Sequence, residues 1–129
     1  MIEVTVRTPE HRVLVDITDR VARAIQDSAE GEGIWLVRVP HTTAGITINE
    51  GADPAVARDI LMAWERVAPE DLAYEHAEGN SPAHVLASVA GSSVLVPFED
   101  GDVQLGTWQS IFLCEFDGPR TRRVSLRKL

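Results

Sequence analysis

The stretch Val94-Leu95-Val96-Pro97-Phe98-Glu99-Asp100-Gly101-Asp102-Val103 decides the fold class. The apolar run at its start is typical of a buried strand, and Asp100-Gly101 favours a two-residue hairpin turn. We therefore predict that the chain folds back after Glu99 into a strand over 103–105. Two more strands are predicted downstream, over 110–116 and 122–126. Hairpin signals of this kind indicate an antiparallel or mixed sheet.

Four strands are predicted nearer the N-terminus. Residues 3–7 and 12–16 alternate apolar and polar side chains around a turn that contains Pro9, so we predict that they form a hairpin. Residues 34–39 form a compact apolar strand that Pro40 ends, and residues 46–49 resume the strand pattern.

Three helices are predicted between these strands. Thr18 is the expected N-cap of the first helix, Asp53-Pro54 starts the second, and Ser81-Pro82 starts the third, which Gly91 ends. The apolar face of the second helix is expected at Val56, Ile60, Ala63, Trp64 and Val67. The chain is therefore predicted to be a single α+β domain over 1–129, with a largely antiparallel sheet arrangement and two or three helices packed on one side.

Composition excludes several classes of protein. Apolar residues make up 44% of the 129 residues and the formal net charge is −8. We expect no nucleic-acid partner, because a phosphate backbone calls for a basic face, and no membrane partner, because no run of 18 apolar residues occurs. The N-terminus lacks a signal-peptide pattern, so a cytoplasmic protein is expected. The single cysteine, Cys114, lies in an apolar run and is predicted to be buried and unreactive.

Three histidines lie in polar segments that contain proline or glycine. His41 follows Pro40 at the end of a strand, His76 lies in an acidic loop, and His84 lies in the first turn of the third helix. Converging imidazoles would suit a divalent metal such as zinc, or would act directly as acid and base. A magnesium site would need one or two of the nearby carboxylates and a phosphate-bearing substrate. The alternative for each histidine is a surface or hydrogen-bonded structural residue, and the spacing matches no short-range metal signature.

A second unusual segment is Leu105-Gly106-Thr107-Trp108-Gln109. A glycine before Thr-Trp-Gln permits close backbone approach, and an aromatic ring beside hydrogen-bonding groups could hold a planar ligand. Trp108 could equally be a core residue. No phosphate-cradling glycine loop or dinucleotide fingerprint occurs, so no organic cofactor is expected.

The sequence resembles the YjbQ-like family, also known as UPF0047 or as a secondary thiamine-phosphate synthase family. The resemblance rests on three motifs, 41–54 (HTTAGITINEGADP), 78–84 (EGNSPAH) and 105–120, which contains LGTWQ and EFDGPR. It implies an α+β fold, a homotrimer, and a polar pocket around the motif histidines that could bind a divalent metal. It also implies a weak thiamine-phosphate synthase activity, which joins a pyrimidine diphosphate to a thiazole phosphate.

These considerations give two leading hypotheses and a third. The chain is an enzyme of undetermined substrate, or it is a non-catalytic metabolite- or metal-binding homo-oligomer, or its histidines form a structural network at a subunit interface. The candidate catalytic and metal-binding residues are His41, His76 and His84. The candidate residues for binding a small phosphorylated metabolite are Thr42, Thr43, Asn49, Asn80, Ser88, Thr107, Trp108, Gln109 and Arg120.

Overall fold

Eight strands of the computed structural model, which describes residues 1–129, form two sheets in which every pairing is antiparallel. The first sheet holds, in spatial order, β1 (Ile2–Arg7), β8 (Thr121–Lys128), β3 (Gly33–Arg38), β5 (Ser93–Glu99) and β6 (Asp102–Val103). The second holds β2 (Val13–Asp16), β7 (Gln109–Glu115) and β4 (Ala44–Glu50). With three helices, this arrangement confirms the predicted α+β class.

The predicted turn at Asp100-Gly101 is confirmed. Glu99 pairs with Asp102 across it. Asp100 and Gly101 have φ values of 51° and 79°, so both central residues adopt the left-handed conformation of a type I′ hairpin turn. This hairpin joins β5 to β6 at the edge of the first sheet.

The predicted N-terminal hairpin is wrong. β1 pairs with β8, where Val6 lies opposite Arg122, whereas β2 pairs with β7, where Leu14 lies opposite Cys114. The chain crosses from one sheet to the other between them, and the Thr8 amide donates to the Arg120 carbonyl at 2.9 Å as it leaves β1. Alternation of side chains identifies a strand but does not identify its partner, which here comes from the other end of the chain.

The helices are α1 (Thr18–Gln26), α2 (Pro54–Val67) and α3 (Ser81–Ala90). Asp53 caps α2 as predicted, since its Oδ1 accepts from the Ala55 amide at 2.9 Å. The other two cap predictions are wrong by one residue, because Ile17 and Asn80 hold those positions and neither makes a side-chain cap bond. The hydroxyl of Thr18 instead donates to Asp16 Oδ1 at 2.7 Å.

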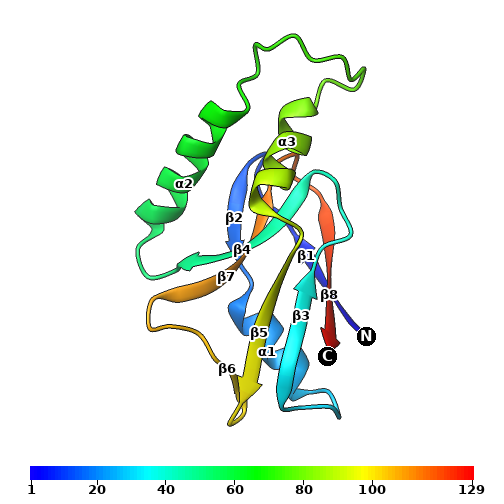
Figure 1. Ribbon diagram of the computed structural model, residues 1–129, viewed down its shortest axis with the longest axis vertical. Coiled ribbons are helices and arrows are strands. Elements are labelled where there is room, and N and C mark those ends of the chain that lie inside the picture. The colour runs from blue at the N-terminus through cyan, green and yellow to red at the C-terminus, as the bar shows by residue number, and fades with distance from the viewer.

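Two hydrophobic cores share the second sheet. One lies between the two sheets and includes α1 residues such as Ile25, while the other lies between the second sheet and helices α2 and α3. Strand β7 supplies both, because Leu113 belongs to the first core and Cys114 to the second. In Figure 1, α2 and α3 lie at one end of the molecule and α1 near the other. Cys114 is therefore buried, as predicted.

Helix α2 packs through a different stripe from the predicted one. The residues that contact the second core are Ala57, Ile60, Leu61 and Trp64, whereas Val67 is 56% exposed. The two stripes share Ile60 and Trp64, so the periodicity alone did not fix which neighbours face inward. The ring of Trp64 meets Phe116 edge-on, with 6.0 Å between centroids. None of the three helices is long and apolar enough to cross a bilayer.

Candidate functional site

His41 makes one hydrogen bond, to the backbone of strand β8 in the first sheet. Its Nε2 accepts a hydrogen bond from the Arg123 amide at 2.9 Å. A ring nitrogen that accepts from an N–H carries no proton, so the neutral ring bears its proton on Nδ1. Burial lowers the pKa of His41, and the nearby charges of Arg122 and Arg123 lower it further. The result is a neutral imidazole whose Nδ1–H is a fixed donor.

A buried ion pair underlies the loop that carries His41. Arg122 donates from Nε to Glu115 Oε1 at 2.8 Å and pairs through Nη2 with the other carboxylate oxygen. The same Nη2 donates to the hydroxyl of Thr43 at 2.8 Å and to its carbonyl at 3.1 Å. Thr8 donates to Glu115 Oε1 at 2.7 Å. The hydroxyl of Thr43, a candidate ligand contact, thus anchors the loop.

The same network leaves Arg122 without a free face for a ligand. Its side chain is 3% exposed, and that of Glu115 is fully buried. Burial raises the pKa of Glu115, but hydrogen bonds from Arg122, Thr8 and the Asp117 amide outweigh burial and lower it overall. Both groups are therefore charged at neutral pH and neutralise each other.

Helix α3 brings His84 and Ser88 toward His41 because its C-terminal end sits directly on β4. The Ile46 amide donates to the Gly91 carbonyl at 2.9 Å. A Cβ atom at Gly45 would lie 2.7 Å from that carbonyl oxygen and 2.8 Å from the Cβ of Ala90. Only glycine at position 45 permits this approach, which fixes the distance between α3 and the His41 loop.

Two cavities meet at His84 and Thr42. The first, of about 430 Å³, has no carboxylate in its lining, which is His41, Thr42, Ala44, His84, Ala87, Ser88, Gly91 and Ser92. The second, of about 400 Å³, is lined by polar and charged residues only: Thr42, Thr43, His76, Glu78, Asn80, His84, Asp117 and Arg120. All three candidate histidines therefore line one or both of two adjoining cavities.

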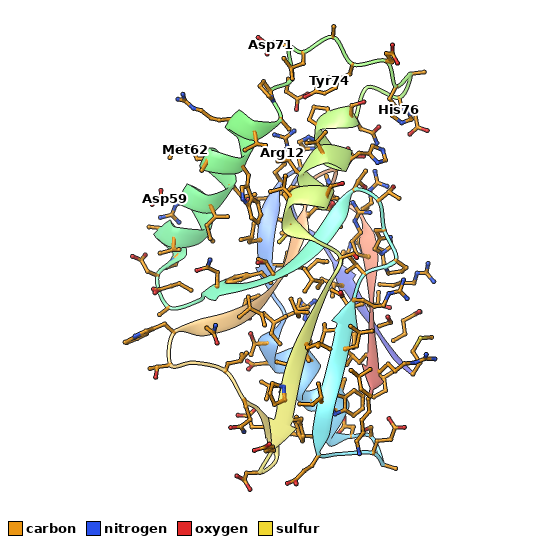
Figure 2. The ribbon with its side chains drawn as sticks, viewed as in Figure 1. Arg12, Asp59, Met62, Asp71, Tyr74 and His76 are labelled. Atoms are coloured by element: carbon orange, nitrogen blue, oxygen red, sulfur yellow. The ribbon has the colours of Figure 1, made fainter.

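A pair of histidines and an ion pair line the second cavity. The rings of His76 and His84 meet edge-on with their centroids 5.3 Å apart. His76 lies on the long segment between α2 and α3 (Figure 2). Asp117 Oδ2 accepts from Arg120 Nη2 and from Asn80 Nδ2, each at 2.9 Å. Arg120 is therefore neutralised by Asp117 at the cavity wall.

The three histidines do not fit a metal site of the predicted kind. No group of three or more His, Cys, Asp or Glu side chains is arranged to hold one ion. His41 has also committed its Nε2 lone pair to the Arg123 amide, which leaves Nδ1 protonated. A zinc ligand must present a free nitrogen lone pair. The donor set of this chain therefore supplies no three-histidine site in this arrangement.

Four candidate residues lie at the opposite end of the second sheet. Asn49 pairs with Ser110 and Glu50 with Gln109, whereas Ala44, next to the His41 loop, pairs with Glu115. Six residue steps along β7 separate these ends, about 20 Å at the usual rise of an extended strand. The distant candidates are Asn49, Thr107, Trp108 and Gln109.

Within that distant group the side chains serve local structure or face solvent. Gln109 Oε1 accepts from the Gly106 amide at 2.8 Å, and Asn49 Oδ1 accepts from the Glu50 amide at 2.8 Å. Trp108 is 64% exposed, so it is not a core residue. Within one chain, residues 106–109 therefore lie far from the histidines.

Sequence reasoning missed Ser92 and Asp117 as lining residues. Asp117 lies within the third motif, three residues before Arg120, and that spacing is the available signal. Ser92 carried no signal, because it contributes only through the contact between α3 and β4.

Comparison with known proteins gives a consistent result. The model of the family described as "UPF0047 protein YjbQ-like" matches residues 2–129. A UPF0047 protein of Methanocaldococcus jannaschii is 46% identical over 122 residues, 95% of this chain and 88% of that protein. The UPF0047 protein YugU of Bacillus subtilis is 44% identical over 125 residues, 96% of this chain and 95% of that protein. A crystal structure from Clostridium acetobutylicum, of an "uncharacterized conserved protein" of the YjbQ/UPF0047 family, is 47% identical with a TM-score of 0.94, and each chain is fully covered.

Proposed function

The chain belongs to the UPF0047 protein YjbQ-like family, and we propose that it is a small-molecule enzyme whose substrate lies across the two cavities that meet at Thr42 and His84. The observation that carries this proposal is the position of His84, which lines both cavities. Histidine is the side chain best suited to move a proton near neutral pH. A group placed between two adjoining cavities can act on a bond that spans them.

His41 and His84 take different roles in this proposal. His41 is neutral, with its proton held on Nδ1 by the Arg123 amide at Nε2. It therefore acts as a fixed hydrogen-bond donor to a developing negative charge. Protonating Nε2 would break the bond to Arg123, so His41 is a poor proton acceptor. His84 serves as the general acid or base.

We place a phosphate group of the substrate in the cavity that His41 lines. That cavity contains no carboxylate and offers the His41 donor together with the exposed hydroxyls of Thr42 and Ser92. Of the charges that act at His41, that of Arg122 is offset by Glu115, so Arg123 is the cation that favours an anion there. The second cavity, with Glu78 and the Asp117–Arg120 pair, suits a polar organic portion.

The family resemblance suggests the first reaction to test. In thiamine-phosphate synthesis a C–N bond forms between a pyrimidine methylene and a thiazole nitrogen, while the C–O bond to diphosphate breaks. The main demand on the protein is stabilisation of the departing diphosphate. The donors of the first cavity would meet that demand, with His84 supplying a proton if one is needed.

The proposal includes a homotrimer, in which a second copy would bring Asn49, Thr107, Trp108 and Gln109 to the ligand. Exposed apolar side chains on the open face of the first sheet, Ile34 and Leu95, support assembly. Mixing His84→Ala with Trp108→Ala protein should restore ligand binding if one site draws on two chains. No restoration would confine the site to one chain.

We also propose a cytoplasmic location, where a lone thiol such as Cys114 stays reduced.

The test combines turnover with ligand binding. Wild-type protein, His84→Gln and the control His11→Ala are supplied with the pyrimidine diphosphate and thiazole phosphate, and product is measured beside diphosphate binding by calorimetry. His11 lines neither cavity. Turnover lost in His84→Gln but kept in His11→Ala is the expected result. Saturable binding without product would favour the alternative, a non-catalytic metabolite-binding oligomer. Absence of both would overturn the site.

A further inference from the structure

Two buried polar atoms near the second cavity have no hydrogen-bond partner. They are Nε of Arg12 and Oδ1 of Asn80. Both residues line the same small cavity of about 50 Å³, beside Glu70, Asp117 and Phe116. A buried polar group normally has a partner, in the protein or in an ordered water.

The two atoms are complementary. The Nε–H of Arg12 can only donate, and the amide oxygen of Asn80 can only accept. One water accepts from the first and donates to the second. The cavity exceeds the roughly 10–15 Å³ that one water needs, and its lining supplies the two to four polar partners that buried waters require.

We propose that this cavity holds an ordered water that bridges Arg12 Nε to Asn80 Oδ1, and that Arg12 is thereby a positioning residue for the histidine site. The identity of that site rests on the function proposed above; the water does not.

Arg12 is well fixed for this role. Its Nη2 lies 2.6 Å from Glu70 and its Nη1 lies 3.6 Å from Glu65, and its side chain is 12% exposed. These contacts join the residue just before β2 to helix α2 and to the segment that follows α2. Figure 2 shows Arg12 between α2 and α3. With both ends of the guanidinium engaged, Nε is left facing inward.

Asn80 connects Arg12 to the site through hydrogen bonds to α3 and to Asp117. Its backbone carbonyl accepts from the Ala83 amide at 3.0 Å and the His84 amide at 3.4 Å, in the first turn of α3. Its Nδ2 donates to Asp117 Oδ2, which also accepts from Arg120. A shift of Asn80 would therefore move both the start of the helix that carries His84 and the carboxylate that holds Arg120.

The first measurement is a crystal structure of the wild-type protein at a resolution that shows ordered water. We expect a water oxygen within about 2.7–3.2 Å of both atoms. Asn80 Oδ1 bonded to a protein donor, or a cavity closed by side chains, would overturn the proposal.

The second measurement uses Arg12→Lys, which keeps the charge near Glu70 but replaces Nε by a methylene group. Arg58→Lys on the exposed face of α2 is the matched control. We expect Arg12→Lys to shift the NMR signals of the His84 ring and the Arg120 Nε–H, and to weaken inorganic phosphate binding three- to tenfold. Arg58→Lys should change neither.

A purely structural role for Arg12 would lower the melting temperature and leave those signals unmoved, and that outcome would overturn the positioning role. If wild-type protein binds no phosphate, the proposed function fails, while the His84 and Arg120 signals still decide the role of Arg12.

Discussion

Replacing Arg122 by methionine removes the cation that faces a fully buried carboxylate. Breaking a buried pair in this way typically costs about 3–5 kcal/mol, because the remaining charge is left unpaired. Here Glu115 keeps only the Thr8 hydroxyl and the Asp117 amide, and Thr43 loses both of its bonds from Arg122. We expect the free energy of unfolding near neutral pH to fall by about 4 kcal/mol, from a total of about 5–15 kcal/mol.

The loss should depend on pH with a defined sign. In the wild type the folded-state pKa of Glu115 is lowered, so its stabilisation is present above the unfolded pKa of about 4.3 and is lost as pH falls through the folded pKa. In Arg122→Met, burial still raises the folded-state pKa of Glu115, but the main group that lowers it is gone. That pKa therefore rises. Stability is then lost as pH rises, so the deficit is largest at neutral pH and shrinks toward pH about 4.3.

Urea denaturation followed by fluorescence, at neutral pH and near pH 4.5, measures both effects. Arg123→Met is the control, because Arg123 is 55% exposed and lies 3.7 Å from Glu3. It should cost less than about 1 kcal/mol. The double variant Glu115→Gln with Arg122→Met should be more stable than Arg122→Met alone. A deficit below about 1 kcal/mol, or one that does not change with pH, would refute the reasoning.

Further predictions concern single residues. The His41 ring should titrate below its ordinary pKa of 6.5 with Nε2 unprotonated, as read by 15N NMR; Nε2 protonated at neutral pH would contradict the donor role. Burial raises the pKa of the Cys114 thiol to about 12, so a thiol reagent should label it only on unfolding. Asp53→Ala should cost about 1 kcal/mol through the lost cap, and Asp59→Ala, exposed on the same helix, almost nothing. Gly45→Ala should cost about 1–3 kcal/mol by overpacking and shift the His84 ring signals.

Much of the fold was predictable because it rests on local signals. The Asp100-Gly101 turn and the Asp53 cap are set by the conformations that those residues prefer. The pairing of β1 with β8 was not predictable in the same way, since its partners lie more than a hundred residues apart and alternation is the same in any pairing.

The candidate site was likewise predictable only in part. His41, His76 and His84 were singled out by their polar, punctuated segments, and the structure brings them to adjoining cavities. The role of Arg122 could not be read from the sequence, because it depends on Glu115 pointing into the space between two sheets. The separation of Trp108 from the histidines likewise follows from the length and direction of β7, which no motif encodes.

From Ile111 to its end at Glu115, strand β7 has no side chain facing solvent, and the next residue, Phe116, is buried as well. Its odd-numbered positions belong to the layer between the sheets and its even-numbered positions to the layer under the helices. A one-residue insertion or deletion within it would exchange the contents of both layers at once and expel the partner of Arg122 from its place. Changes in chain length can therefore be absorbed only in the loops at its two ends, the one with Trp108 and the one with Asp117 and Arg120. Relatives of this protein should vary in length outside this strand and never within it.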